Sequence, residues 1–377
     1  MESLVMAGAN VDKAFWNGKR VFLTGHTGFK GSWLSIWLVS MGARVTGFSL
    51  APTTEPSLFK ILDVEHQVDT SILGNINDLD TLSKAIQASA AEIVIHMAAQ
   101  PLVRYGYANP LETYTTNVLG TAHVLEAVRH MPGVRAVLVV TTDKCYENKE
   151  HGEQFQESDS LGGYDPYSSS KACAELVAAA YRQSYFNAKK DSGYVAVATA
   201  RAGNVIGGGD WSSDRLIPDA IRAFNRGEPV IIRNPLAIRP WQHVIEPLSG
   251  YLLLLENLYH HGDQFASAWN FGPHNSDTRS VSSVIELMAT RWHQSASWTL
   301  IGIEQPHEAQ LLRLDCSKAH DKLRWHQRWS LEVTIEKIAA WHQSHNEQQD
   351  MLEISLAQIE QYQNHADVVD FFRHCDL

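Results

Sequence analysis

The sequence predicts an α/β protein built on a doubly wound parallel sheet, with a smaller mixed α/β region at its C-terminal side. Three observations support this prediction. Short apolar runs alternate with amphipathic stretches, a glycine-rich segment follows the first apolar run, and the alternation stops after about Arg201. Continuous apolar runs are typical of strands that helices cover on both faces, and their alternation with helices favours a parallel sheet.

The expected strands are short apolar runs with polar or glycine residues after them. They are Arg20–Thr24, Arg44–Phe48, Val68–Leu73, Ile93–Met97, Ala136–Thr142 and Val195–Ala200. The expected helices lie between them, and they are Trp33–Leu38 with its stop near Gly42, Asp78–Ala88, Leu111–His130 and Tyr167–Asn187. We expect residues up to about Asn17 to form an irregular lead-in.

The alternation of expected strands and helices stops beyond Arg201, where Gly207–Gly209 interrupts the pattern. The segments that follow are shorter, and they are Asp214–Arg226, Val230–Arg233, Glu246–His260, Trp269–Phe271 and Ser280–His293. The Gln-rich end is expected to be helical around Met351–Tyr362. We therefore predict one domain at 1–203 and a second at 204–377, with some segments of the second returning to the first.

Composition excludes several classes of function. The chain has 377 residues and a net charge of −11, which argues against nucleic-acid and anionic-membrane surfaces but not against an anionic substrate. Its cysteines (Cys145, Cys173, Cys316 and Cys375) have no CxxC spacing, and its histidines have no HExxH spacing. We therefore expect no zinc site, no other metal and no disulfide framework. Without a signal peptide or a long apolar run, a cytoplasmic protein is expected.

A glycine loop follows the first expected strand with GxxGxxG spacing. Gly25 permits a tight turn, Gly28 lets the backbone approach a pyrophosphate, and Gly31 allows close helix packing. The spacing is a weak signal by itself, since turns often carry glycines, but its position in a βαβ pattern favours a nucleotide site. The predicted cofactor loop comprises Gly25, His26, Thr27, Gly28, Phe29, Lys30 and Gly31.

The end of the second strand bears on which cofactor this is. Phe48–Ala51 contains no carboxylate for ribose hydroxyls and no Arg or Lys for a 2′-phosphate. NAD is therefore the expected cofactor. We expect it to be bound less tightly than in relatives that have this carboxylate, and to be lost on purification.

Tyr167 and Lys171 carry the strongest chemical signal. Four residues apart on a helix, they share one face. A lysine ammonium nearby is expected to lower the tyrosine pKa from about 10 and so create a base that takes a proton from an alcohol as hydride leaves. An ordinary surface helix is the alternative, and the position downstream of a nucleotide loop argues against it.

A polar strand end supplies three further candidates. Thr142, Asp143 and Lys144 follow the apolar run that begins at Ala136, and ligands of open α/β sheets bind at the carboxyl ends of strands. Thr142 is placed to bond the same alcohol as Tyr167, Asp143 to act as an acid, and Lys144 to act as a charge or a base; a solvated turn is the alternative. Further candidates along the chain are Asn204, Arg239, His243 and Asn270. Arg239 would either bind a diphosphate or be an ordinary surface arginine.

The chain resembles the extended short-chain dehydrogenase/reductase family in six motifs. These are Thr24–Gly31, His96–Gln100, Asn117–Thr121, Tyr167 with Lys171, Arg201–Trp211 and Arg239–Val244. Within that family it is most similar to the sugar-nucleotide 4,6-dehydratases, with CDP-glucose as the implied substrate. The resemblance implies a Rossmann-type NAD domain at 1–203 and a mainly sugar-nucleotide domain at 204–377. It also implies a homodimer, or a tetramer, through helices near 111–130 and 167–187, and a role in deoxy sugars for bacterial surface polysaccharide.

The resemblance also implies roles for individual residues. NAD would contact the glycine loop together with Asn75, Ile76, Ala98, Ala99, Gln100, Asn117, Tyr167 and Lys171. The sugar nucleotide would contact Gln100, Arg104, Asn204, Arg239, His243 and Asn270. Tyr167, with Thr142 and Lys171, would remove the proton of the sugar 4-hydroxyl, and Asp143 would protonate the departing 6-hydroxyl.

One departure from the family pattern concerns Lys144, where the related dTDP-glucose dehydratases carry Glu. A lysine amine of unperturbed pKa is a poor base for C5. Either its pKa is depressed, or it stabilises the enolate while another group takes the proton. The rival functions are a sugar-nucleotide 4-epimerase, a dehydratase of another sugar nucleotide and a non-catalytic nucleotide sensor. The Asp143–Lys144 pair argues against an epimerase, and the presence of both Tyr167 and Lys171 argues against a sensor.

Overall fold

A computed structural model describes residues 8–148, 154–187, 194–292, 297–300 and 312–373. Its centre is a seven-stranded sheet in which every neighbouring pair is parallel, in the order β11-β6-β5-β4-β1-β2-β3. The strands are β1 Arg20–Thr24, β2 Arg44–Ser49, β3 Thr70–Leu73, β4 Ile93–His96, β5 Ala136–Val140, β6 Ala196–Arg201 and β11 Ala268–Asn270. The predicted doubly wound parallel sheet is confirmed.

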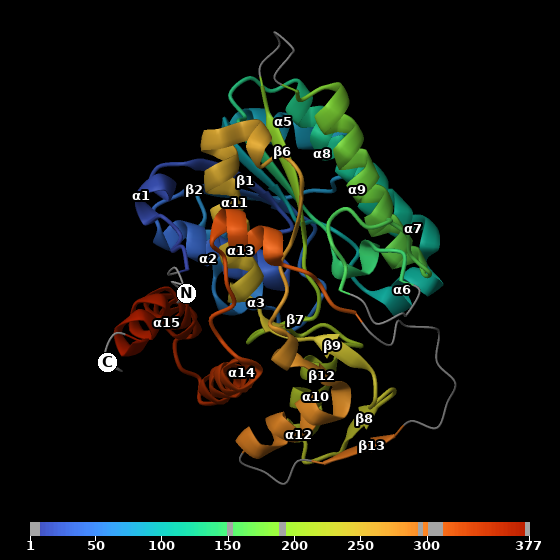
Figure 1. Cartoon of the computed structure of the whole chain (residues 1–377), viewed down its shortest axis with the longest axis vertical. Coiled ribbons are helices and arrows are strands. Elements are labelled where there is room, and N and C mark those ends of the chain that lie inside the picture. Colours follow the sequence, from blue (N-terminus) through green and yellow to red (C-terminus); the bar gives the residue numbers. More distant parts are fainter. Residues whose placement is uncertain (1–7, 149–153, 188–193, 293–296, 301–311, 374–377) are drawn as a thin grey trace, which may run out of the picture.

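Helices cover both faces of this sheet (Figure 1). The main helices on one face are α2 Phe29–Ser40, α11 Ile245–His261, α13 Ser317–Leu323 and α15 Met351–Arg373. Those on the other face are α5 Leu79–Ser89, α8 Gly120–Arg129 and α9 Pro166–Ser184. Strand β1 shows why two cores form: Val21 and Leu23 pack into the first and Phe22 into the second, because successive side chains point to opposite faces.

A smaller unit with its own apolar core lies beyond the carboxyl ends of the strands (Figure 1). It contains α10 Leu216–Asn225, β8 Val230–Ile232, β9 Ile238–Pro240, β12 Thr278–Ser280, α12 Val281–Arg291, β13 Trp298–Leu300 and α14 Leu331–Asn346. The short strands β7 Val205–Ile206 and β10 Gln242–His243 pair in parallel, and β7 lies between this unit and the large sheet in Figure 1. Four later segments belong to the layers of the large sheet, and they are α11, β11, α13 and α15. This arrangement places the smaller unit where ligands of open α/β sheets bind.

The remaining short elements connect these layers. They are α1 Lys13–Trp16, α3 Leu58–Ile61, α4 Val64–Gln67, α6 Val103–Ala108, α7 Pro110–Tyr114, the π-helical turn η1 Thr115–Leu119 and the 3₁₀ turns η2 Asp143–Cys145, η3 Gly262–Gln264 and η4 Asn275–Asp277. No helix in the described ranges is both long and apolar enough to cross a membrane.

The irregular lead-in predicted before Asn17 is wrong in part, because α1 forms there. The Asp12 side chain accepts a hydrogen bond from the Ala14 amide, which caps this helix. Trp16 is buried, and its indole Nε1 donates to Glu256 Oε1 at 2.7 Å. A tertiary contact with α11 therefore holds a turn too short for periodicity to reveal.

The helix predicted over Leu111–His130 is interrupted. Its central part, η1, makes π-helical hydrogen bonds, and α7 and α8 lie on either side. Asn117 lies in this π turn and is buried. Such turns insert a residue into a helix and are frequent at functional sites. Of the other predicted segments, Ser280–His293 forms a helix from Val281 to Arg291, and His293, like Cys375, lies outside the described residues.

Buried histidines predict a loss of stability in acid. Burial lowers the pKa of His96, His243 and His342 to about 3, whereas unfolded histidines titrate near 6.5. The unfolded chain therefore binds more protons as pH falls below 6.5, and stability decreases. Burial raises the pKa of Glu246 and Glu256 to about 7, which opposes this trend between 7 and 4.5.

We therefore expect the steepest loss below about pH 4.5, where the two glutamates no longer oppose it, and these three histidines contribute roughly 4 kcal/mol per pH unit. Urea unfolding of the protein at pH values from about 7 down to about 3.5 measures this slope. Replacement of one of these residues, His342→Phe, should make the slope shallower by about 1.4 kcal/mol per pH unit. A slope that is unchanged in the variant would contradict the assignment.

Candidate active site

The predicted polar strand end enters a 3₁₀ turn directly after β5. Thr142 is the residue before η2, and its side-chain Oγ1 accepts a hydrogen bond from the Lys144 amide at 3.3 Å. The same Oγ1 donates to Asp143 Oδ1 at 3.1 Å, and Thr142 is also hydrogen-bonded to the side chain of Tyr167. The structure thus brings Thr142, Asp143, Lys144 and Tyr167 together at the carboxyl end of the central sheet.

Asp143 is a buried carboxyl group whose pKa is raised above that of an exposed aspartate. The side chain is 1% exposed, and its Oδ2 is buried without a hydrogen-bond partner in the described residues. Burial raises the pKa of Asp143, although the charges of Lys144, Arg239 and Lys30 and the bond from Thr142 oppose that rise. A protonated carboxyl with a free oxygen can donate to a leaving hydroxyl.

Gly203 makes room for this carboxyl group, a role the sequence did not reveal. A Cβ atom at position 203 would lie 1.7 Å from Asp143 Oδ2 and 2.1 Å from its Cγ. Any larger residue therefore displaces the carboxyl. The glycine was visible in the Arg201–Trp211 motif, but only the fold brings it against Asp143.

We predict that Gly203→Ala lowers kcat roughly 10²-fold, because a displacement of about 1 Å in a catalytic group has costs of that order. Steady-state kinetics together with the melting temperature measure the effect. Gly8→Ala serves as the matched control, since its Cβ would meet nothing closer than 3.7 Å. Equal activity of the Gly203 variant and the control would contradict a positioning role.

Tyr167 and Lys171 lie one turn apart on α9, as predicted, and both are buried. The predicted lowering of the tyrosine pKa is wrong: burial raises the pKa of Tyr167 to about 12, against the opposing effects of the Thr142 bond and the Arg215 charge. Lys171 donates its Nζ to the Val140 carbonyl oxygen at 3.2 Å. Burial lowers the pKa of Lys171 to about 8. Desolvation of the phenol therefore outweighs any effect of the lysine in this structure.

A buried network continues from Lys171 along α9. Glu175, one turn later, accepts from Thr141 Oγ1, from Thr199 Oγ1 at 2.7 Å and from Arg201 Nη2 at 2.9 Å. The negative charge of Glu175 raises the pKa of Lys171 and so favours its ammonium form. Sequence reasoning missed Glu175, although it repeats the four-residue spacing of Tyr167 and Lys171.

The glycine loop forms a cradle at the start of α2. Gly25 has a φ of +81°, and a Cβ there would lie 2.7 Å from the Ala98 amide nitrogen. A Cβ at Gly31 would lie 2.0 Å from the Gly25 carbonyl oxygen. Gly28 precedes the helix, and no side chain caps its first amides. Uncapped amides at a helix start suit a pyrophosphate, so these residues fit a dinucleotide.

Other loop residues hold this cradle in place. Thr27 Oγ1 pairs with Ser49 Oγ at 2.9 Å and donates to the Leu50 carbonyl oxygen at 2.8 Å. His26 is buried, and its Nε2 pairs with Ser71 Oγ at 2.8 Å. The Phe29 ring packs against Gly207, 3.0 Å from a Cβ built there. These contacts join the loop to the ends of β2 and β3 and to the segment after β6.

The other predicted cofactor residues line the neighbouring strand ends. Asn75 is exposed beside β3, and Ile76 packs against Gly120. After β4, the Ala98 amide donates to Thr24 Oγ1 at 3.1 Å, with Ala99 next in the chain.

Asn117 ties the end of β4 to the catalytic helix. Its Oδ1 accepts from the Gln100 amide at 2.8 Å, and its Nδ2 donates to the Gln100 carbonyl oxygen and to Ser170 Oγ. The Gln100 side chain donates to Thr113 Oγ1 and accepts from the Leu102 amide. Asn117 and Gln100 therefore place the loop after β4 beside Tyr167 and Lys171.

The predicted substrate residues fall into two groups. Arg104 forms an ion pair with Asp214 at 3.0 Å, Asn204 has a φ of +42°, and the charge of buried Arg239 acts on Asp143. By contrast, His243 and Asn270 are fully buried. This placement does not support the direct substrate contact predicted for the latter two.

The surroundings of His243 and Asn270 explain their burial. His243 packs between Trp33 and Trp329 and accepts at Nδ1 from the Ile245 amide. Asn270 accepts from the Tyr146 hydroxyl at 2.7 Å and donates to the carbonyl oxygens of Phe155 and Asp315. Both side chains therefore hold neighbouring segments of the chain together through buried contacts.

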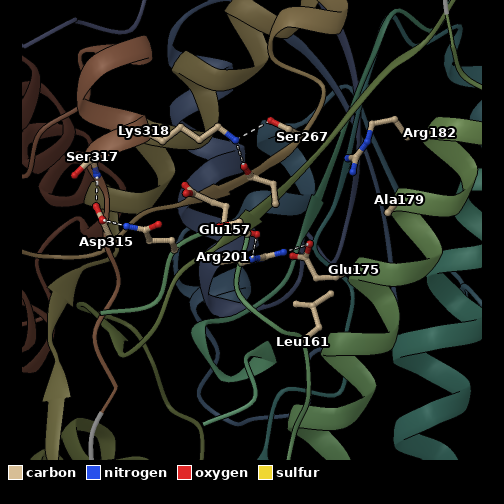
Figure 2. Close-up of a pocket in the computed structure, with 13 residues that line it drawn as sticks. Glu157, Leu161, Glu175, Ala179, Arg182, Arg201, Ser267, Asp315, Ser317 and Lys318 are labelled. Carbon is tan, nitrogen blue, oxygen red and sulfur yellow. Dashed lines mark hydrogen bonds and ion pairs between the residues drawn. The ribbon is translucent and has the colours of Figure 1, made fainter. Parts of the chain in front are cut away.

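A pocket of about 550 Å³ lies beside the Glu175–Arg201 pair (Figure 2). Figure 2 shows Lys318 at the same pocket, where its Nζ donates to Ser267 Oγ at 2.9 Å. None of the predicted catalytic side chains lines it. We place the chemistry at the Tyr167 cluster, because the acid, the tyrosine and the glycine cradle meet there. In the described part of the chain, no group of three or more His, Cys, Asp or Glu side chains is arranged to hold a metal ion.

Comparison with known proteins identifies the family. Residues 22–338 match the family described as GDP-mannose 4,6 dehydratase. A CDP-glucose 4,6-dehydratase of Salmonella typhimurium is 52% identical over 353 residues, which cover 93% of this chain and 98% of that protein. A dTDP-glucose 4,6-dehydratase from Bacillus anthracis, solved in complex with NAD, is 20% identical with a TM-score of 0.72, covering 89% of this chain and all of that one.

A further solved structure, MoeE5 in complex with UDP-glucuronic acid and NAD, is 25% identical with a TM-score of 0.71. It covers 87% of this chain and all of MoeE5. The family match spans the glycine loop, the Thr142–Lys144 turn and the Tyr167 helix. The chain belongs to the GDP-mannose 4,6 dehydratase family, the sugar-nucleotide dehydratases and epimerases of the extended short-chain dehydrogenase/reductases.

Proposed function

We propose that this protein is an NAD-dependent CDP-glucose 4,6-dehydratase, a hydro-lyase that converts CDP-glucose to CDP-4-keto-6-deoxyglucose. The observation that carries the proposal is the buried Asp143 carboxyl, with its unpaired Oδ2, beside Thr142 and Tyr167. An epimerase needs the tyrosine but has no use for a buried acid. The choice of CDP-glucose rests on the relative of that name with 52% identity.

NAD would be held by the cradle of Gly25, Gly28 and Gly31, with the loop after β4 and Lys171 as further contacts. When bound, NAD would supply the acceptor for a hydride from C4 of the sugar and the donor of that hydride to C6, and its positive charge would favour the tyrosinate form of Tyr167. We place the cofactor on the large sheet and the sugar nucleotide between that sheet and the smaller unit, which lies within 204–377.

The side chains supply the proton transfers. Tyr167, hydrogen-bonded to Thr142, takes the proton of the 4-hydroxyl as the hydride departs. The resulting 4-ketone acidifies C5. Asp143 then protonates the 6-hydroxyl, which leaves as water while a base removes the C5 proton. Arg239, close enough to influence Asp143 by its charge, is placed to hold the substrate diphosphate.

The test is incubation of the purified protein and added NAD with CDP-glucose, dTDP-glucose, UDP-glucose and GDP-mannose in separate reactions. Mass spectrometry of each product should show loss of one water from CDP-glucose alone. An isomer of unchanged mass would make the protein an epimerase. Loss of water from another sugar nucleotide would change the substrate, and binding without conversion would favour a nucleotide sensor.

We also propose a homodimer through the outer faces of α7, α8 and α9, which lie together along one side of the molecule (Figure 1). Three leucines on α7, η1 and α9 support this interface: Leu111 is 82% exposed, Leu119 52% and Leu176 58%. Exposed leucines clustered on neighbouring helices are typical of association surfaces.

We predict that Leu119→Glu combined with Leu176→Glu converts the dimer to a monomer, because the pairing would bury two charges without partners. Sedimentation velocity of the wild type and the variant measures this. Leu236→Glu, at a leucine 79% exposed in the smaller unit, is the control and should remain dimeric. A monomeric wild type would contradict the interface, and a tetramer would require a second one.

The biological setting forms a further part of the proposal. We propose a cytoplasmic enzyme that supplies a deoxy sugar for bacterial O-antigen or related surface polysaccharide. The free state of Cys145, Cys173 and Cys316 supports a reducing compartment.

A further inference from the structure

An ion pair with almost no exposure to solvent joins the helix of Tyr167 to the end of β6. Glu175 on α9 and Arg201 on β6 are each 3% exposed, and Arg201 Nη2 donates to Glu175 Oε2 at 2.9 Å. Figure 2 shows the guanidinium and the carboxylate pointing toward each other. Glu175 follows Lys171 by one helical turn and Tyr167 by two, so these three side chains share one side of α9.

The same pair contacts both ends of the acid turn, which we define as Thr142–Cys145. Thr141, directly before the turn, donates its Oγ1 to Glu175 Oε1. Tyr146, directly after the turn, accepts at its hydroxyl from Arg201 Nη1 at 2.8 Å. The Arg201 guanidinium also lies over the Tyr146 ring, 4.8 Å from the ring centroid. One ion pair therefore holds the acid turn from both sides.

Bonds to two neighbouring strands fix the pair itself. Glu175 Oε2 also accepts from Thr199 Oγ1 of β6 at 2.7 Å. The Tyr146 hydroxyl that Arg201 contacts donates in turn to Asn270 Oδ1 of β11 at 2.7 Å. Strands β6 and β11 are paired in the large sheet, so the pair has a support that the sheet holds in place.

The energetics of buried ion pairs indicate what this one contributes. Removing two charged groups from water costs about as much as their mutual attraction returns, so such a pair adds little stability by itself. Its hydrogen bonds have fixed directions, however, and a buried pair can therefore hold segments in one relative position. Here the segments are the acid turn and α9, which meet where Thr142 is hydrogen-bonded to Tyr167.

On the basis of the proposed function, we propose that Glu175 and Arg201 are positioning residues. They fix the acid turn against α9 so that Tyr167 and Asp143 reach the same bound sugar. Tyr167 acts in the first half of the reaction and Asp143 in the second, whereas the pair positions both of them and lies behind them. A looser pair should therefore slow both halves and leave the binding of CDP-glucose and NAD unchanged.

Thr141→Val and Tyr146→Phe test this role, because each removes one hydroxyl contact of the pair and nearly preserves the shape of the side chain. We expect kcat to fall roughly 10-fold in each variant and roughly 10²-fold in the double variant, since a displacement of about 1 Å has costs of that order. KM for CDP-glucose should stay at the wild-type value. Stopped-flow absorbance should show that bound reduced nicotinamide both forms and is consumed more slowly.

Two further variants serve as comparisons. Thr199→Val removes a bond to the same carboxylate from a residue that does not adjoin the acid turn. It should lower the melting temperature about as much as Thr141→Val does, with a smaller loss of kcat. Tyr259→Phe removes a hydroxyl on α11 that donates to Glu92 Oε1 at 3.0 Å, and it should keep the wild-type kcat.

Several results would overturn the proposal. Equal losses of kcat in Thr141→Val and Thr199→Val would mean that the pair only packs α9 against the sheet. Wild-type kcat in the double variant, or a raised KM with unchanged kcat, would also contradict a positioning role. Slower formation of reduced nicotinamide with normal consumption would confine the effect to Tyr167. Failure of the wild type to dehydrate CDP-glucose would instead refute the proposed function, and with it the role of the pair in that reaction.

Discussion

Tyr167→Phe should abolish the first half of the reaction. The ring stays in its buried site, but the hydroxyl that bonds Thr142 and takes the 4-hydroxyl proton is lost. Proton transfer by a positioned side chain typically contributes 10²- to 10⁴-fold, and we expect kcat to fall by about this factor. Stopped-flow absorbance should show no reduced nicotinamide after CDP-glucose is added, because hydride transfer cannot proceed without removal of the proton.

The control for this variant is Tyr185→Phe, which alters a more exposed tyrosine just after the same helix. It should have wild-type kinetics. Equal melting temperatures and equal NAD affinity of the two variants would show that the loss of kcat comes from the chemical step. Normal formation of reduced nicotinamide by Tyr167→Phe would contradict the role of this residue as the base.

Asp143→Asn should stop the second half of the reaction and leave the first intact. The amide has nearly the shape of the acid but no proton to give to the 6-hydroxyl. We expect turnover to fall by roughly 10²- to 10⁴-fold while bound reduced nicotinamide accumulates. This accumulation distinguishes loss of the acid from loss of Tyr167, because the latter blocks an earlier step.

The pH dependence of water loss supports the same assignment. Burial raises the pKa of Asp143, so the acid form persists to higher pH than in an exposed aspartate, and the rate falls as pH rises through that pKa. This descending limb should disappear in Asp143→Asn and remain in Asp80→Asn, which alters an exposed carboxylate on α5. A descending limb that persists in Asp143→Asn would assign the acid to another group.

The sequence predicted the sheet well because buried parallel strands leave a direct signal. β1 occupies Arg20–Thr24 as predicted, and apolar runs marked the other main strands. One strand ends earlier than predicted, and the residues that follow it belong to the site. β5 ends at Val140, so Thr141 and Thr142 lie beyond it and reach the site. By contrast, the π turn at Thr115–Leu119 was not predicted. Asn117 within it bonds to a distant segment, and helical periodicity carries no signal of such a bond.

The site was predicted less completely, because burial depends on packing between distant segments. The motif around His243 suggested a ligand, yet Trp33 and Trp329, far away in sequence, enclose its ring. The spacing of Tyr167 and Lys171 predicted their shared face but not the desolvation that governs the tyrosine pKa. Gly203 acquires its importance only where β6 brings it against Asp143.

The central claim is that one hydride moves from C4 to C6 of the same sugar while Tyr167 and Asp143 handle the protons. CDP-glucose labelled with deuterium at C4 tests it directly, with the product analysed by mass spectrometry and NMR. The account predicts a product that is lighter by one water and carries the deuterium at C6. A product of unchanged mass with inverted C4, or a dehydrated product that has lost the label to solvent, would contradict it.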